Sequence, residues 1–217
     1  MFVRMIGAVL VSAAVCGPAH AQKRNLSFDL LASARSGDVA SVGRLLDDGA
    51  SPNARNRLGD TPLNMAARQG QLELVRLLIR RGADVNQPNL ARVTPLMSAA
   101  FGGHDEVVRE LLAQRADQTP SDRVHKTALI YAAGNGSVGS LRALLDAGGD
   151  PDQRDAEGET LLMWAAAYGK TENLALLLGR GAKVDARDGR GLTALSIAAE
   201  QKQGDAVKVL EQAGAPR

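Results

Sequence analysis

Residues 59–70 read Gly-Asp-Thr-Pro-Leu-Asn-Met-Ala-Ala-Arg-Gln-Gly, and residues 82–86 read Gly-Ala-Asp-Val-Asn. Parts of this pattern return every 33 residues, and each copy carries a threonine: Thr61, Thr94, Thr127, Thr160 and Thr193. A Leu follows each threonine by two positions, and an Ala-Ala pair follows it by five and six. Repetition at a fixed period predicts a stack of one repeated unit rather than a single folded core.

Each unit is expected to contain two short helices. Thr61 can cap the first helix with its hydroxyl, and Pro62 suits the first helical position because an N–H there would be unpaired anyway. Gly70 can end this helix in the left-handed conformation. A second helix begins near Leu72, carries an apolar stripe along one face and ends at Gly82. Such a helix pair cannot bury its stripe alone, so it must pack against neighbouring units.

These residues together closely resemble the ankyrin repeat. The resemblance implies an all-α solenoid of about six stacked helix–turn–helix units with projecting hairpin-like turns. It covers residues 26–217, with units at about 26–55, 56–88, 89–121, 122–154, 155–187 and 188–217. The first unit lacks Thr-Pro-Leu, and the last carries polar substitutions such as Lys202 and Glu211. We therefore expect these two units to cap the stack.

Some positions depart from the family pattern. The His of the family's Thr-Pro-Leu-His segment is missing from every copy, which predicts a less rigid turn. Arg92 and His125 replace the Gly found two positions before Thr, and Arg115 replaces the Gly that closes the second helix. A side chain where positive φ is required suggests a remodelled turn. The units at 89–121 and 122–154 are thus predicted to be the least regular, and to be where a partner docks.

The N-terminus has the features of a secretory signal peptide over residues 1–21. Arg4 supplies a positive charge, residues 5–15 are an apolar run, and Ala19-His20-Ala21 suits cleavage. The run is too short to span a membrane, which takes about 20 residues. Cleavage after Ala21 would leave residues 22–25 as a short linker and remove Cys16, the one cysteine. These features predict a periplasmic protein, or alternatively a secreted one, without membrane association after cleavage.

The resemblance also implies where a partner would bind, because ankyrin proteins contact partners mostly through the turn tips and the ends of the first helices. Apolar residues at these positions have basic residues on one side and acidic residues on the other, as suits a protein interface. The predicted protein-binding residues are Leu90, Val93, Phe101, Arg123, Val124, Lys126, Asn135, Glu157, Glu159 and Tyr168. The alternative is that Phe101 and Val93 only pad a loosened turn. Tyr131 and Trp164 fall at a register position expected to face the interior.

The sequence predicts no catalytic, cofactor-binding or metal-binding residues. His104 stands where the repeat commonly has Gly-His, which indicates a structural role, and no His, Cys or carboxylate set has metal-ligand spacing. The formal net charge is +2, and basic residues are interspersed with acidic ones, which argues against a nucleic-acid partner. We predict a monomeric, non-catalytic module that binds an unidentified protein. The alternatives are a secreted effector that binds host proteins and an unrecognised enzyme.

Overall fold

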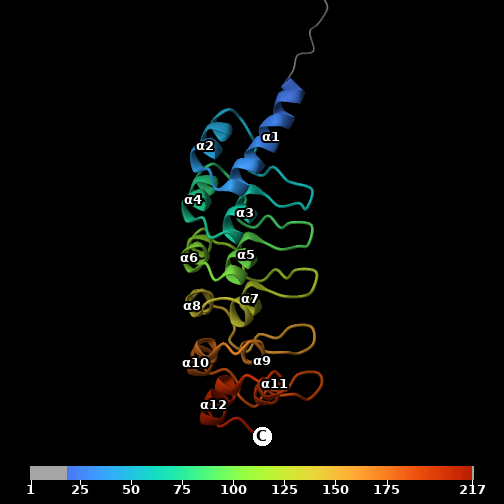
Figure 1. Cartoon of the computed structure of the whole chain (residues 1–217), viewed down its shortest axis with the longest axis vertical. Helices are drawn as coiled ribbons and strands as arrows, with labels where there is room; N and C mark the ends of the chain where they lie inside the picture. Colours follow the sequence, from blue (N-terminus) through green and yellow to red (C-terminus); the bar gives the residue numbers. More distant parts are fainter. Residues whose placement is uncertain (1–18, 217) are drawn as a thin grey trace, which may run out of the picture.

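The computed structural model describes residues 19–216, with side chains described from Leu26 onward. Twelve helices in this part of the chain form six consecutive pairs, one for each expected unit. The first helices of successive units pack in one column, the second helices in another, and five long turns project from one side of the stack (Figure 1). The all-α solenoid of stacked helix pairs is therefore confirmed.

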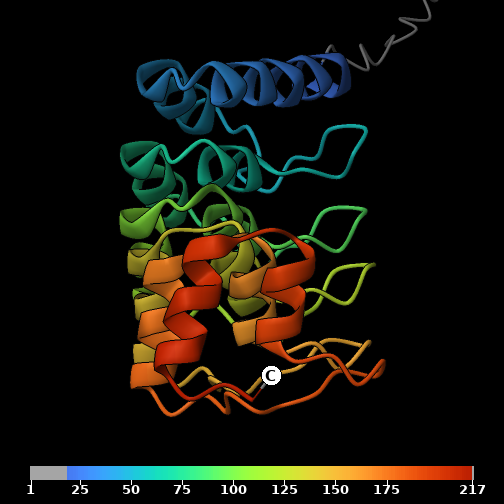
Figure 2. The ribbon, with the colours of Figure 1, turned by 60° about the horizontal axis from the view of Figure 1, so that its bottom comes forward.

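The helix boundaries follow the 33-residue period. The first helices of the six units are α1 (Ala19–Ser36), α3 (Pro62–Arg68), α5 (Pro95–Gly102), α7 (Ala128–Gly134), α9 (Leu161–Ala167) and α11 (Ala194–Glu200). The second helices are α2 (Val39–Asp47), α4 (Leu72–Arg80), α6 (Asp105–Ala113), α8 (Val138–Asp146), α10 (Thr171–Gly179) and α12 (Gly204–Gln212). Figure 2 shows the turns extending away from both columns at a steep angle.

The periodic threonines begin the first helices, as predicted. The hydroxyl of each accepts a hydrogen bond from the backbone N–H three residues later, at 3.1–3.4 Å. Pro62 and Pro95 occupy the first turns of α3 and α5, where a missing N–H is harmless. Each cap is worth about 1 kcal/mol to its helix.

The core lies between the two columns of helices. The Ala66-Ala67 pair is completely buried, which lets the helices of neighbouring units approach closely. On α4, Leu74, Val75 and Leu78 form the buried stripe, and the same pattern recurs along the stack. Burial of small and aliphatic side chains in every unit explains how a chain with 3% aromatic residues holds a continuous core.

The irregular turns keep the backbone of the regular ones, so the prediction of a remodelled turn is wrong. Arg92 has φ 63° and His125 has φ 61°, close to the 77° of Gly59 at the equivalent position. Arg115 likewise has φ 60° where Gly82 has 84°. The hydrogen bonds of the unit hold these side-chain-bearing residues in the left-handed region, at a cost of about 1–2 kcal/mol each.

The first unit differs from the others in the length of its first helix. Helix α1 has 18 residues, whereas α3 has 7. Its backbone includes residues 22–25, which were expected to be a linker, and the predicted cleavage point after Ala21 falls in its first turn. The rest of the predicted signal peptide, residues 1–18, lies outside the described residues. Among the described helices, none has the length and apolar character needed to cross a membrane.

Candidate protein-binding surface

Five turns of one geometry form the tips of the stack. Each turn opens with an Asn or Asp whose Oδ1 accepts hydrogen bonds from the backbone N–H groups two and four residues later, at 2.8–3.1 Å. The five residues are Asn56, Asn89, Asp122, Asp155 and Asp188. A short polar side chain that bonds to its own backbone in this way stabilises a tight turn. These bonds fix every tip without the family's histidine.

Backbone hydrogen bonds also join most neighbouring tips. The N–H of Leu90 donates to the carbonyl of Leu58 at 3.0 Å, and the N–H of Arg123 donates to Ala91 at 3.1 Å. The N–H of Gly189 donates to Glu157 at 2.9 Å. Within the described residues no such bond joins the turns at 122–126 and 155–159. There the hydroxyl of Thr127 donates to Oε1 of Gln153 at 2.9 Å instead.

Two aromatic residues line the helix side of these turns, and both bond to the residue that fixes the tip. The Tyr131 hydroxyl donates to Oδ2 of Asp122, and one repeat later Nε1–H of Trp164 donates to Oδ2 of Asp155 at 2.9 Å. Each Asp therefore holds its turn with one carboxylate oxygen and positions an aromatic ring with the other. Burial raises the pKa of Tyr131, and the hydrogen bond and charge of Asp122 raise it further, so the hydroxyl remains a donor.

The interior prediction for Tyr131 and Trp164 is only partly right. Both rings pack against the core, but both side chains are half-buried rather than enclosed. Their polar atoms need a partner, and the nearest carboxylates lie at the turns, so the rings lie at the edge of the core.

Four aromatic rings form two contacts on this side of the molecule. Phe101 meets Tyr131 edge to face, with ring centroids 5.5 Å apart and an interplanar angle of 89°. Trp164 and Tyr168 are stacked at 6.1 Å and 15°. Nζ of Lys126 lies 4.0 Å from the centroid of the Trp164 ring, which places a cation over its face. Lys126 thus connects the turn at 122–126 to α9 of the next unit.

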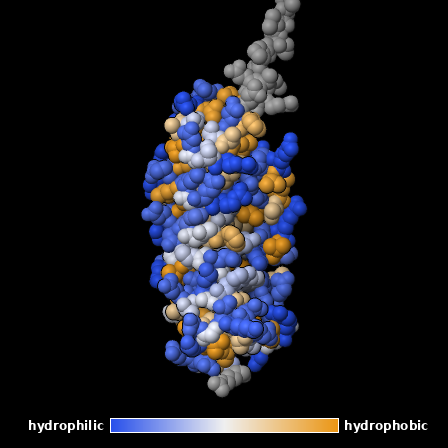
Figure 3. All heavy atoms as spheres, in the orientation of Figure 1, coloured by the Kyte–Doolittle hydropathy of each residue, from blue (hydrophilic) through white to orange (hydrophobic). Residues whose placement is uncertain are grey.

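The structure exposes most of the predicted binding residues. Leu90, Phe101, Val124 and Tyr168 are large apolar or aromatic side chains exposed by 47–61%. Arg123, Asn135 and Glu157 are also exposed, while Val93, Lys126 and Glu159 are half-buried. In the space-filling view, hydrophobic groups are separated by polar surface along the side that carries the turns (Figure 3).

Two predicted residues depart from this grouping. Val93 packs against the core, as the padding interpretation expected for it, whereas Phe101 does not bury itself. Asn135 lines a separate hollow of about 540 Å³ between the loops that join the paired helices, near Ser137 and Lys170. Its carbonyl accepts from Nζ of Lys170 at 3.5 Å.

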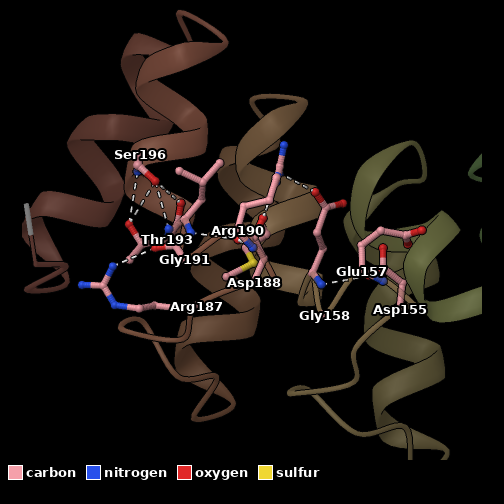
Figure 4. A network of polar contacts seen from close by, with 12 residues as sticks. Asp155, Glu157, Gly158, Arg187, Asp188, Arg190, Gly191, Thr193 and Ser196 are labelled. Carbon is pink, nitrogen blue, oxygen red and sulfur yellow. Dashed lines mark hydrogen bonds and ion pairs between the residues drawn. The ribbon is translucent and has the colours of Figure 1, made fainter.

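Charged side chains link the last two tips, which Figure 4 shows in detail. Nη2 of Arg190 lies 2.9 Å from Oε1 of Glu159 and 2.8 Å from Oδ2 of Asp188. Burial raises the pKa of Glu159, and the charge of Asp155 adds to this effect while Arg190 opposes it. Burial also acts to raise the pKa of Asp188, but hydrogen bonds from Leu192 and Arg190 outweigh it and lower the value.

His104 has the structural role that its position predicts. Its Nε2 lies 3.0 Å from the backbone carbonyl of Arg68, at the end of α3 in the preceding unit. Gln203 makes the equivalent contact to Ala167 at 3.3 Å. Among the described residues, no cluster of three or more His, Cys, Asp or Glu side chains is suited to hold a metal ion.

The sequence interpretation missed the Asn or Asp at the start of each turn. This residue stands five positions before each periodic threonine, so its 33-residue recurrence is visible in the sequence. Its bonds to Tyr131 and Trp164 also have a regular spacing of nine residues. The recurrence of Asn or Asp is visible in the sequence, but the family motif alone does not indicate that this side chain hydrogen-bonds to the backbone of the turn.

The fold and the tips define a repeat solenoid that presents a row of rigid turns. A family model for ankyrin repeats matches residues 30–122, 82–155 and 129–215, and the chain belongs to the ankyrin repeat family. Ankyrin repeats imply protein–protein binding, and proteins of the family are usually non-catalytic binding modules.

Two solved structures are similar to nearly the whole described chain. One is the ankyrin repeat protein EF0377, with 29% identity and a TM-score of 0.75 over 85% of this chain and 96% of that one. The other belongs to the complex of the predatory endopeptidase Bd0816 from Bdellovibrio bacteriovorus with the immunity protein Bd3460. Its matching chain has 28% identity and a TM-score of 0.76 over 85% of this chain and 97% of that one. Among curated proteins, none matches this sequence.

Proposed function

We propose that this chain is a non-catalytic module that acts after export and binds a protein through its turn tips and the adjoining ends of the first helices. The observation that carries the proposal is the set of exposed side chains on the hydrogen-bonded tips and at the ends of α5 and α9. Phe101, Val124 and Tyr168 are each about half exposed or more, in a protein whose core is otherwise well buried. Large apolar side chains on a rigid frame lose little conformational entropy when a partner covers them.

The charges around this surface support one centre of contact. Arg123 is exposed and Lys126 half-buried on one turn, while Glu157 is exposed and Glu159 half-buried on the next. Aromatic anchors between opposite charges give a partner both buried area and a defined orientation. The proposed centre is therefore the junction between the turns at 122–126 and 155–159, where Lys126 lies over Trp164.

Export rests on the sequence features of residues 1–21. The periplasm is the compartment we propose, and a secreted effector acting on host proteins is the alternative. Fractionation of the native cells separates the two, since most of the protein in the culture medium would exclude a periplasmic resident. An intact Met1 in the accumulated protein, detected by mass spectrometry, would overturn export by signal cleavage.

A photo-crosslinking experiment in the native cell tests the binding surface. A photoreactive residue replaces Val124 at a tip in one version, and Arg142 on α8, in the other column, serves as the matched control. We expect a discrete crosslinked protein from position 124 alone. The double variant Phe101→Ser, Val124→Ser should reduce binding of that protein at least about tenfold. Equal crosslinking from both positions, or full binding by the double variant, would refute this surface.

A peptidase is the more specific partner class that the comparisons favour. The relative from the endopeptidase–immunity protein complex aligns over 97% of its own length, so the likeness covers a whole binding module. The test is to add the purified chain to the exported peptidases of the native cell and measure hydrolysis of a casein substrate. Inhibition that the Phe101→Ser, Val124→Ser variant lacks would support a peptidase partner, and undiminished hydrolysis would exclude this class.

A further inference from the structure

A second hollow lies at the N-terminal end of the stack, away from the centre of the proposed binding surface. It has a volume of about 720 Å³ and lies between α1 and the first turn. Phe28 and Leu31 line it from α1, and Leu58 lines it from the turn. Phe28 is 72% exposed and Leu58 is 64% exposed, so the first unit does not present the polar face that a cap usually has.

The charges that line this hollow are all positive. Arg35, Arg55 and Arg57 contribute to its wall, and none of the described residues that line it is acidic. No ion pair among the described residues involves any of the three. Asp29 is close in sequence, but helical geometry places it on the side of α1 away from Phe28, Leu31 and Arg35. Asp60, at the end of the same turn, is buried and already bonded to Arg68 at 2.9 Å.

This combination of groups indicates the chemistry of an occupant. Guanidinium groups bind carboxylates through paired N–H donors, and three unpaired ones around an apolar floor favour a ligand that carries both acidic and apolar groups. The basic character continues along the tips, where Arg92 and Arg123 are exposed and form no ion pair among the described residues. It ends at Glu157, where the sign of the surface charge changes.

We propose that this hollow receives an acidic segment of the partner protein. Carboxylates of the segment pair with Arg35, Arg55 and Arg57, and one of its apolar side chains enters between Phe28 and Leu58. This inference rests on the proposed protein-binding function and names the chemistry of the partner at a second point of contact. An acidic segment running along the first three tips would lead the rest of the partner to the aromatic residues beyond them.

The test uses the full chain and short fluorescein-labelled peptides, with binding followed by fluorescence anisotropy. One peptide alternates Glu with Leu and Phe, a second has Lys in place of Glu, and a third has Ser in place of the apolar residues. A single-stranded oligothymidine of similar length is the fourth probe. We expect the Glu-Leu-Phe peptide to bind most tightly and to weaken as salt is raised, since screening shortens from about 10 Å at 0.1 M to about 3 Å at 1 M.

Matched variants locate the binding. Arg55→Glu with Arg57→Glu should weaken binding of the Glu-Leu-Phe peptide about tenfold or more, whereas Arg109→Glu with Arg142→Glu, on α6 and α8, should leave it unchanged. Phe28→Ser should also weaken binding, and its circular dichroism should match the wild type because the ring is exposed. Tighter binding of the Lys peptide or the oligothymidine, or equal loss in both Arg pairs, would overturn the proposal.

The partner captured by crosslinking separates this inference from the proposed function. That partner could bind the Arg55→Glu, Arg57→Glu variant with normal affinity but bind the Phe101→Ser, Val124→Ser variant weakly. In that case the acidic-segment proposal fails and the binding surface stands. If both pairs of substitutions leave its affinity unchanged, both proposals fail. Weakened binding by both pairs, with the Arg109→Glu, Arg142→Glu control unaffected, supports both.

Discussion

Replacing Asp155 with Ala should remove the residue on which the fourth tip and the Trp164 ring both depend. Oδ1 of Asp155 accepts from the N–H groups of Glu157 and Glu159, at 3.1 and 2.8 Å, and Oδ2 accepts from Nε1–H of Trp164 at 2.9 Å. Water can replace the bond at the exposed Glu157 N–H. The other two donors are partly buried, and each bond lost there costs about 1–1.5 kcal/mol. The free energy of unfolding should therefore fall by about 2–3 kcal/mol.

The measurement is denaturation in urea, followed both by circular dichroism and by the fluorescence of Trp164, the one tryptophan. Asp185→Ala is the matched control, because Asp185 is an exposed aspartate at the end of the same unit. It forms no hydrogen bond or ion pair within the described chain. The control should shift the midpoint little, since surface substitutions usually lie within about 0.5 kcal/mol of the wild type.

Asp155→Asn separates the two roles of the carboxylate. An amide keeps one oxygen for the turn, as Asn56 and Asn89 show at the equivalent positions, but it cannot also accept from Trp164. We expect a loss of about 1 kcal/mol and a changed Trp164 emission. The reasoning is refuted if Asp155→Ala costs no more than Asp185→Ala. If Asp155→Asn costs as much as Asp155→Ala, the turn does not depend on Oδ1.

Three further changes test other parts of the fold. His125→Gly should stabilise the protein by about 1 kcal/mol, because Gly adopts φ 61° without steric cost; a lower urea midpoint would contradict this. Thr127→Ala should destabilise it by about 1–2 kcal/mol through loss of the α7 cap and the bond to Gln153, measured in the same way. Glu159→Gln tests the raised pKa of Glu159. Ionising this carboxyl costs more free energy in the folded chain than in the unfolded chain. The wild type therefore loses folding stability as pH rises through the folded pKa of Glu159. The gain of Glu159→Gln over wild type should be larger at pH 7 than below the unfolded value of 4.5, and a gain independent of pH would exclude the effect.

The helices could be predicted because their signals are local. A threonine cap, a proline in the first turn and a left-handed residue at the end each act within one helix, so their period alone fixes the boundaries of helices such as α3. The same logic misjudged Arg92 and His125. A residue with a side chain pays a steric cost of about 1–2 kcal/mol when its φ is positive. The turn's own hydrogen bonds, including His125 N–H to the Asp122 carbonyl at 3.2 Å, outweigh that cost.

The surface could be predicted only in part. Register placed Phe101, Val124 and Tyr168 on the exposed side because the period assigns each position to one face. Contacts between units could not be predicted from the register, because they depend on how one unit packs against the next. The cation over Trp164 joins Lys126 to a ring from the following repeat, and the N-terminal hollow joins α1 to the first turn. Neither contact can be recognised from the sequence of a single repeat.

Some residues at the turns serve both the fold and the binding surface. This limits the positions at which a substitution can change partner specificity without changing the turn. Asp122 and Asp155 each fix a turn with one oxygen and an aromatic ring with the other, so a change at either position alters the shape of the tip itself. Val124 and Glu157 stand two residues later, where only the backbone N–H takes part in the turn and the side chain is exposed. A new side chain at these positions changes what the tip contacts while leaving its hydrogen bonds intact. Specificity for a partner should therefore reside at Val124 and Glu157, and affinity should depend on the aromatic rings that Asp122 and Asp155 hold in place.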